Sequence, residues 1–264
     1  MSAAQPLIRH REGAGPPLVL RHGLGLSWRS WTPVLARLAG RHDVIALDLP
    51  GFGSAPALDG EPTIGAIADA VAAEPDGLGL ERPAFAGNSL GGSVALELAR
   101  RGRAARVVVL GPAGLETQAE RVAVIGLNET QRAVFVAAAP MATFLTQHPG
   151  SRAALLSWLH GRAWRLEPDD AAREIRDFAW CPGFHATLRH ATSTWAPEQL
   201  REVGVPVRVC LGSRDLVIGA ISGPRQVEAI PGAELVRLPG CGHVPMPDDP
   251  DLVADAIADG PDPA

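Results

Sequence analysis

The chain has 264 residues, a net charge of −5 and 46% hydrophobic residues, which are ordinary values for a folded globular protein. All 24 basic residues are arginines scattered among acids, so no basic patch predicts a nucleic-acid partner. Because lysine is absent, the chain cannot form a Schiff base, attach pyridoxal phosphate or carry a Walker-type phosphate loop. Tyrosine is absent too, so no phenol can act as an acid or electrophile.

The cysteines and the apolar segments indicate which cross-links, metal sites and cellular location to expect. The three cysteines, Cys181, Cys210 and Cys241, are odd in number and widely spaced, which predicts neither a disulfide framework nor a metal site. The N-terminus has no apolar stretch before Arg9, so we expect no signal peptide. No segment approaches the ~18 continuous apolar residues of a membrane span, so we expect no membrane association and a cytoplasmic protein.

The first half of the chain alternates short apolar runs with longer amphipathic segments. Expected strands cover residues 18–20, 44–47, 84–87 and 107–110, and expected helices begin after Ser30 and cover residues 64–73 and 90–101. Strands joined by helix-length crossovers predict a mostly parallel sheet that is covered on both faces. The run at 107–110 is continuously apolar, as is typical of a strand buried on both faces.

The same alternation resumes near the C-terminus. Expected strands cover residues 205–211 and 235–238, and expected helices include residues 226–230 and 252–258. The sequence therefore predicts one α/β core that is built from two separate parts of the chain.

Strands disappear from the middle of the chain. Residues 129–147, 151–164 and 169–180 are expected to be helical, with helix starts at Asn128 and Ser151, a first-turn proline at Pro168 and a kink or break at Pro140. This segment also carries four of the six tryptophans, Trp158, Trp164, Trp180 and Trp195. We therefore expect a core of residues 1–111 and 205–264, with residues 112–204 forming a helical cap over the carboxyl edge of the sheet, where ligands bind in open α/β folds.

A candidate nucleophile lies in the sequence Gly87-Asn88-Ser89-Leu90-Gly91, between an expected strand and an expected helix. A serine on such a tight strand-to-helix turn needs small residues two positions away on both sides, because a Cβ there would collide with the neighbouring strand and helix. The turn exposes the serine hydroxyl at the sheet edge, above the positive end of the following helix. The context predicts that Ser89 is a catalytic nucleophile.

A serine hydroxyl needs a general base to act at neutral pH. His243 is the candidate, because it follows an expected strand and directly precedes the last expected helix. Asp215, in a loop after an earlier strand, is expected to orient this imidazole, which gives the chain order Ser, Asp, His. Asp248 and Asp249 are nearer to His243 in sequence, but both are expected to cap the last helix.

An acyl-transfer site also needs two donors for the developing oxyanion. We expect one to be the backbone N–H of Leu90, which follows the nucleophile, and the other to be the backbone N–H of Leu24, in the loop that begins at His22. His22 itself is expected to shape this loop rather than to act in catalysis.

These features resemble α/β-hydrolase fold proteins of the capped, esterase-like type. The resemblance rests on residues 22–25, residues 48–54, the elbow at Ser89, Asp215, and residues 242–243. It implies a mostly parallel central sheet of about eight strands flanked by helices, a helical cap inserted after strand 6, and no cofactor. In that family residues 48–54 form a structural turn. The early strands are poorly marked here, and the usual N-terminal hairpin has no clear counterpart.

Arg21 is a second departure from the family pattern, since an apolar residue usually stands before His22. A carboxylate at the end of this strand is its candidate partner.

Other chemistries occur on the same fold. Epoxide hydrolases and haloalkane dehalogenases use an aspartate at the elbow, where this chain has Ser89, and hydroxynitrile lyases use a lysine. Carbon–carbon bond hydrolases share the Asn-Ser elbow, but they usually carry a tryptophan after the catalytic histidine, where this chain has Val244. Cofactor-free haloperoxidases share the whole triad and stay open as an alternative.

The leading hypothesis is hydrolysis of a carboxylic ester, lactone or thioester of an apolar small molecule through an acyl-enzyme. Expected wall residues of the substrate pocket are Trp158, Val217 and Val244. Carbon–carbon cleavage of an enol-keto acid is an alternative, in which Arg162 or Arg165 would hold the carboxylate. A non-catalytic ligand receptor on the same fold is another, because fold does not determine function. Nothing in the sequence indicates the oligomeric state.

Overall fold

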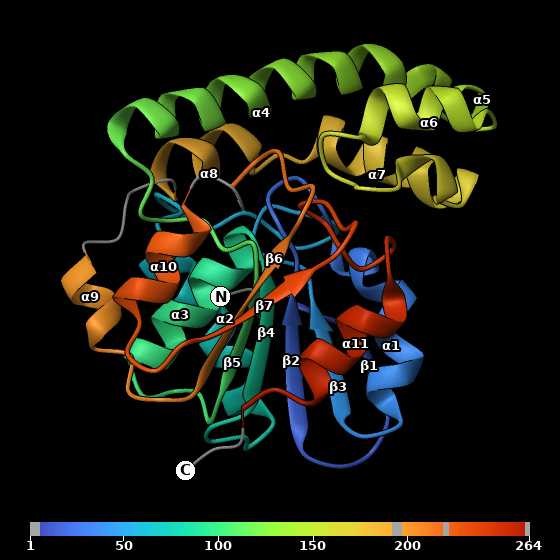
Figure 1. Cartoon of the computed structure of the whole chain (residues 1–264). Coiled ribbons are helices and arrows are strands. Elements are labelled where there is room, and N and C mark those ends of the chain that lie inside the picture. Colours follow the sequence, from blue (N-terminus) through green and yellow to red (C-terminus); the bar gives the residue numbers. More distant parts are fainter. Residues whose placement is uncertain (1–5, 192–196, 219–221, 262–264) are drawn as a thin grey trace.

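A computed structural model describes residues 6–191, 197–218 and 222–261 (Figure 1). Its centre is a seven-stranded sheet with the strand order β1-β3-β2-β4-β5-β6-β7. The strands are β1 (Ile8–Glu12), β2 (Pro17–Arg21), β3 (Asp43–Leu47), β4 (Ala84–Asn88), β5 (Val107–Leu110), β6 (Val207–Gly212) and β7 (Glu234–Leu238). β1 runs antiparallel to β3, and the other neighbours are parallel. The predicted α/β fold with a mostly parallel sheet is confirmed.

The described sheet has seven strands rather than about eight, and the long helical insertion follows its fifth strand rather than a sixth. The sequence did not predict β1, because Ile8–Glu12 is an edge strand with polar residues and no fully buried side chain. In contrast, all four residues of β5 are buried, as its apolar sequence predicted.

Helices cover both faces of the sheet (Figure 1). One face carries α1 (Thr32–Ala39) and α11 (Pro250–Ala258), which pack against each other, and the short helix η1 (Trp28–Trp31) precedes α1. The opposite face carries α2 (Ile64–Gly77), α3 (Leu90–Arg100), α9 (Pro197–Arg201) and α10 (Gly223–Ala229). Because the parallel strands all end at one edge, the loops that follow them gather beneath the remaining helices.

Those remaining helices lie above the carboxyl edge of the sheet (Figure 1). They are α4 (Gln118–Ala138), η2 (Ala139–Met141), α5 (Ala142–Leu145), α6 (Pro149–Leu156), η3 (Ala163–Arg165), α7 (Pro168–Trp180) and α8 (Phe184–His190). We call this group, residues 118–190, the cap helices. α9 follows them in sequence but packs against α3 and α10 of the core. Trp195 lies outside the described residues.

The first cap helix starts earlier than its sequence suggested. Thr117 and Glu120 form a reciprocal capping box at the start of α4, whereas Asn128 lies inside the helix and donates to the carbonyl of Val124 at 2.8 Å. The predicted start at Asn128 was therefore wrong: asparagine is a favoured N-cap residue, but Thr117 is the N-cap and the Asn128 side chain bonds back to the preceding turn instead. Pro140 ends α4 as expected, since α4 gives way to η2 just before it.

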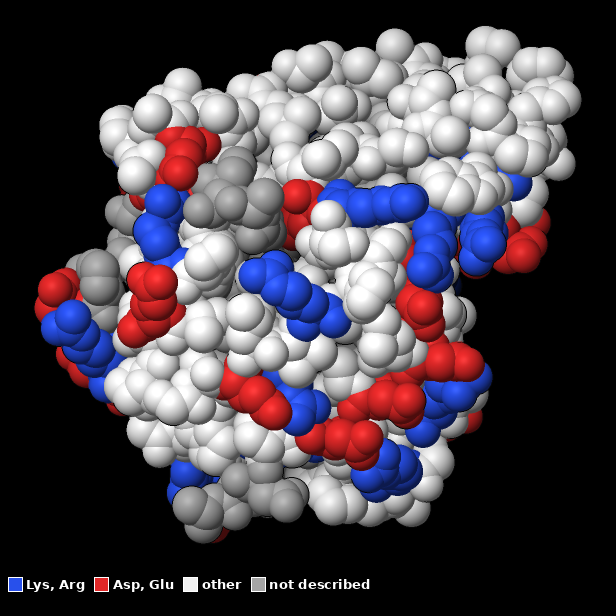
Figure 2. Space-filling model, viewed as in Figure 1, with Lys and Arg blue, Asp and Glu red and all other residues white. Residues whose placement is uncertain are grey.

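Charged side chains are unevenly distributed over the face shown in Figure 2. They gather over the sheet and its flanking helices, whereas the upper part of the cap, over α4, α5 and α6, is almost uncharged in this view. Large hydrophobic side chains exposed on the cap helices include Val122, Val136, Met141 and Phe144. Within the part of the chain that the structure describes, no helix combines the length and apolar character needed to cross a membrane.

Candidate active site

Ser89 occupies the turn between β4 and α3 with φ 51° and ψ −117°, a conformation that non-glycine residues seldom adopt. The turn is possible only because the backbones around it approach closely. A Cβ on Gly87 would lie 2.2 Å from the carbonyl oxygen of Gly91, and a Cβ on Gly91 would lie 2.4 Å from the carbonyl oxygen of Arg21. The glycines on both sides of Ser89 are thus a steric requirement of this turn.

Backbone hydrogen bonds hold the strained turn in place. The Ser89 N–H donates to the carbonyl of Leu110 on β5 at 2.9 Å. The Ser89 carbonyl accepts the N–H groups of Gly92 at 2.9 Å and Ser93 at 3.1 Å. These bonds seat Ser89 at the N-terminus of α3, where the helix dipole favours negative charge.

His243 and Asp215 form a buried pair beside the turn. His243 Nδ1 lies 2.9 Å from Asp215 Oδ2, although the residues are 28 positions apart. Asp215 Oδ1 accepts the N–H groups of Val217 at 2.8 Å and Ile218 at 3.0 Å, which fixes the carboxylate plane. Burial acts to raise the pKa of Asp215, but the neighbouring His243 and these donors outweigh it, so the pKa is lowered. An ionised Asp215 requires the proton on Nδ1 of His243, which leaves Nε2 free to act as a base.

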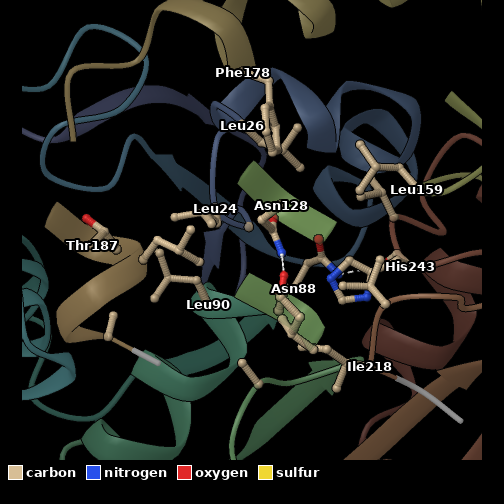
Figure 3. A pocket seen from close by; sticks show the side chains of 18 of the residues that line it. Leu24, Leu26, Asn88, Leu90, Asn128, Leu159, Phe178, Thr187, Ile218 and His243 are labelled. Atoms are coloured by element: carbon tan, nitrogen blue, oxygen red, sulfur yellow. Dashed lines mark hydrogen bonds between the residues drawn. The ribbon is translucent and has the colours of Figure 1, made fainter. Parts of the chain in front are cut away.

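Asn88 links the turn to the loop that carries His243. Its Nδ2 donates to the carbonyl of His243 at 2.8 Å and to the carbonyl of Leu110 at 2.9 Å. Figure 3 shows Asn88 beside His243, with Leu24 and Leu90 on the other side of the pocket. The residue before the candidate nucleophile therefore also positions the candidate base.

The candidate oxyanion donors, the amides of Leu24 and Leu90, belong to residues that line the same pocket as Ser89. Among the described residues, neither amide donates a hydrogen bond. The loop of Leu24 is shaped by His22, whose Nε2 accepts the N–H of Leu49 at 2.9 Å and whose Nδ1 faces the carbonyl of Gly23 at 2.8 Å. Burial lowers the pKa of His22, so this histidine is neutral and structural.

The pocket around Ser89 is apolar. Its lining includes the sequence-predicted residues Ser89, His243, Leu24, Leu90, Trp158, Val217 and Val244. Asn128 of α4, Phe178 of α7 and Thr187 of α8 also line it (Figure 3), and none of the three was predicted. They could not be singled out because helical periodicity shows which face of a helix is apolar, but not which residues face a cavity.

Two arginines that were candidate carboxylate ligands lie elsewhere. Arg162 Nη1 donates to the carbonyl of Asp248 at 2.7 Å and lies 3.3 Å from Asp249 Oδ2. Arg165 lines a separate cavity between η1 and α7. Neither side chain lines the Ser89 pocket.

The two acids after His243 have different roles. Asp249 caps α11 as expected, since its Oδ1 accepts the N–H of Leu252. The expectation that Asp248 also caps this helix is wrong. Its buried carboxylate accepts the N–H groups of Gly161 at 2.8 Å, Arg162 at 2.7 Å and Gly242 at 2.7 Å, and so joins the cap to the His243 loop.

The cysteines do not compete with Ser89 as nucleophiles. All three are free and buried, and burial raises the pKa of Cys241, which is near His243 in sequence, to about 12. Within residues 6–191, 197–218 and 222–261, no group of three or more His, Cys, Asp and Glu side chains is arranged to hold a metal ion.

The chain is similar in sequence to proteins named as hydrolases. The chain is 31% identical over 253 residues to a putative carbamate hydrolase, RutD, of Pseudomonas savastanoi, covering 92% of each chain. It is 33% identical over 201 residues to the epoxide hydrolase EphH of Mycobacterium tuberculosis, covering 72% of this chain and 91% of the relative.

Among solved structures, the enol-lactonase of Burkholderia xenovorans superposes with a TM-score of 0.75 at 23% identity, covering 95% of this chain and 94% of that one. At this identity the likeness concerns the fold alone. Residues 18–256 match the sequence model of the alpha/beta hydrolase family. The chain therefore belongs to the alpha/beta hydrolase family.

Proposed function

We propose that this chain is a serine hydrolase that cleaves an uncharged, largely apolar carboxylic ester, lactone or thioester through an acyl-enzyme. Ser89 is the nucleophile, His243 the general base and Asp215 the acid that orients it. The amides of Leu24 and Leu90 stabilise the oxyanion. The proposal rests above all on the 2.9 Å contact between His243 Nδ1 and Asp215 Oδ2, in a pocket that His243 shares with Ser89.

The reaction has two steps. In acylation, His243 Nε2 accepts the Ser89 proton as Oγ attacks the carbonyl carbon, and the same proton then passes to the leaving alcohol or thiol. In deacylation, His243 takes a proton from water, the hydroxide attacks the acyl-enzyme, and Ser89 leaves with the proton returned. Among the described residues no hydrogen bond joins Ser89 Oγ to His243 Nε2, and such bonds often form only when substrate is bound.

The character of the pocket limits the substrate. No Arg, Asp or Glu stands among the described residues that line it, so a charged acyl group would lose its water without gaining a partner. An enol-keto acid brings a carboxylate, and both Arg162 and Arg165 lie outside this pocket. This favours a neutral ester, lactone or thioester over the carbon–carbon cleavage of an enol-keto acid.

The names of the relatives fit the same type of chemistry. Carbamates and enol-lactones, which stand in the names of two similar proteins, are acyl compounds whose hydrolysis passes through tetrahedral intermediates. The relative named as an epoxide hydrolase suggests different chemistry, but an elbow serine with a histidine base suits acyl transfer.

The test uses a panel of short and medium p-nitrophenyl esters, lactones and an aryl carbamate, together with a fluorophosphonate probe. We expect wild type to be labelled promptly and to turn over at least one ester. Ser89→Ala should abolish labelling and lower kcat at least about 10⁴-fold. Ser151→Ala, a serine in the cap helix α6, is the matched control and should keep both activities.

The other outcomes separate the alternatives. Labelling at Ser89 without turnover of any acyl substrate would contradict the proposed substrate class and favour carbon–carbon cleavage or haloperoxidase chemistry. The absence of both labelling and turnover would contradict the hydrolase proposal. It would favour a ligand receptor.

A further inference from the structure

A short cap segment, residues 159–162, lies against the loop that carries His243. The Val244 N–H donates to the carbonyl of Leu159 at 2.9 Å. A Cβ on Gly161 would lie 2.2 Å from the carbonyl oxygen of Gly240, and a Cβ on Gly242 would lie 2.5 Å from the Gly161 nitrogen. The two backbones are therefore in direct contact, and glycine on both sides is what allows it.

His160, in this segment, contacts Val244, the residue that follows the candidate base His243. Its side chain has no exposed surface, and its Nδ1 lies 3.0 Å from the carbonyl oxygen of Val244. Its Nε2 lies 2.8 Å from Glu174 Oε1 on α7. Both partners are acceptors, so both bonds exist together only when each ring nitrogen carries a proton. The geometry thus selects the imidazolium form of His160.

The surrounding charges agree with this form. Burial acts to lower the pKa of His160, but Glu174 and Asp248 act against it, so the pKa is raised. Two cations also face this region: Arg162 donates to the carbonyl of Asp248 at 2.7 Å, and Arg214 donates to the carbonyl of Gly161 at 2.8 Å.

We propose that His160, held by Glu174, is a positioning residue for the base His243. It fixes the Val244 peptide from the cap side, while Asn88 fixes the His243 carbonyl from the core side at 2.8 Å. The inference rests on the proposed function, because it assigns His160 a role in setting the position of the general base. His160 does not touch substrate.

The start of the same segment also forms part of the pocket wall. Leu159, its first residue, and Trp158 just before the segment line the cavity that contains Ser89. A displacement of a catalytic group by about 1 Å can cost about 100-fold in rate. The buried side chain of His160 therefore links the pocket wall on the cap to the loop of the base, in addition to the Val244–Leu159 hydrogen bond and the contacts of Asp248.

A matched pair of substitutions isolates the Val244 contact. In His160→Asn the amide nitrogen replaces Nδ1 and can still donate to Val244, whereas in His160→Gln it replaces Nε2 and reaches only Glu174. We expect His160→Gln to lower kcat about 10- to 100-fold with KM nearly unchanged, and His160→Asn to recover most of this loss. His185→Gln breaks the exposed pair with Glu129 on the cap and is the control that should keep kcat.

The pH profile gives a readout that a merely structural role would not move. When neutral, His160 either loses the Val244 bond or faces Glu174 with a lone pair, so kcat of wild type should fall as the pH rises through the pKa of His160. In Glu174→Gln the amide can donate to neutral Nε2 while Nδ1–H stays on Val244, so this alkaline fall should disappear. Protonated His160 also stabilises the folded protein. Because the pKa of His160 is raised in the folded state, this stabilisation is present below about pH 6.5 and is lost as the pH rises through the folded-state pKa.

Failure of the inference and failure of the proposed function are distinguishable. The ¹⁵N chemical shifts of the His160 ring report its protonation without any substrate, and we expect both nitrogens protonated at pH 6, below the ordinary pKa of histidine. A neutral ring would overturn the inference, and so would equal kcat in His160→Gln and wild type. If wild type hydrolyses no acyl substrate, the proposed function fails, and this inference fails with it even when the ring is protonated.

Discussion

Two adjacent residues of β2 and the following loop, Arg21 and His22, are both fully buried but differ in their partners. His22 uses both ring nitrogens, toward Leu49 and Gly23, and is neutral. The three guanidinium nitrogens of Arg21 have no hydrogen-bond partner among the described residues, and the group stacks over the Phe85 ring at 4.1 Å. The carboxylate partner considered for Arg21 is therefore absent from the described residues. Burial lowers the pKa of Arg21 to about 9.

Arg21→Met should stabilise the protein, because an isolated buried charge costs free energy that an apolar side chain of similar size does not. We expect the free energy of unfolding at pH 7 to rise by about 1–4 kcal/mol. The pKa of Arg21 is lower in the folded state than in the unfolded state, so the unfolded state binds this proton more tightly. Wild type therefore gains stability as the pH rises above about 9.

Urea unfolding at pH 7 and pH 10 checks both parts. The stability difference between Arg21→Met and wild type should be smaller at pH 10. A less stable variant at pH 7 would contradict the expectation.

At the scale of elements, the β4–α3 turn is determined by its glycines. Gly91→Ala would bring Cβ to 2.4 Å from the backbone oxygen of Arg21 and 2.6 Å from that of His22, neither of which can move freely. We expect a loss of about 1–3 kcal/mol or more in stability, with loss of fluorophosphonate labelling as Ser89 is displaced.

Gly126→Ala is the matched control for this prediction. Gly126 lies in α4, and a Cβ there meets no atom within 4 Å. The change should stabilise the protein by about 0.5–1 kcal/mol and leave labelling unchanged. Equal effects of both substitutions in urea unfolding would show that the crowding at Gly91 does not matter.

Most strands and helices could be predicted, and the failures have local causes. β5 and α7 carry strong periodic or continuous apolar patterns, and both lie where they were expected. β1 was missed because an edge strand needs no apolar face, and the start of α4 was missed because Thr117 caps a helix whose first turns are partly exposed.

At the scale of the whole molecule, Asp248 joins the cap helices to the core. It is buried and accepts N–H groups from the cap segment and from the His243 loop. In Asp248→Asn the amide nitrogen must face one of these donors, so we expect a loss of about 1.5–3 kcal/mol in stability. The cap segment at residues 159–162 should also become faster in amide hydrogen exchange.

Asp249→Asn is the control, because asparagine is an equally good N-cap and the contact of Asp249 with Arg162 is partly exposed. It should change stability by less than about 1 kcal/mol. Thermal unfolding of both variants measures the difference, and equal losses would contradict the assignment of Asp248 as the link between cap and core.

Features that depend on neighbours in the chain could be predicted from the amino-acid sequence. The turn at Ser89 is one example, since its strand, its glycines and its helix are contiguous, and the alternation that predicts a parallel sheet is another. Asp215 and His243 could be nominated from their positions after strands, because parallel strands end at one edge.

Which of these groups meet, and which other residues hold them, depends on the packing of the folded chain. His160 contacts the Val244 carbonyl, and Asp248 links the cap to the core, although these partners are far apart in sequence. Arg21, in contrast, has no hydrogen-bond partner for its guanidinium group among the described residues. Such contacts depend on how the cap helices sit on the sheet edge. That placement is set by the packing of many side chains together, which no local pattern encodes.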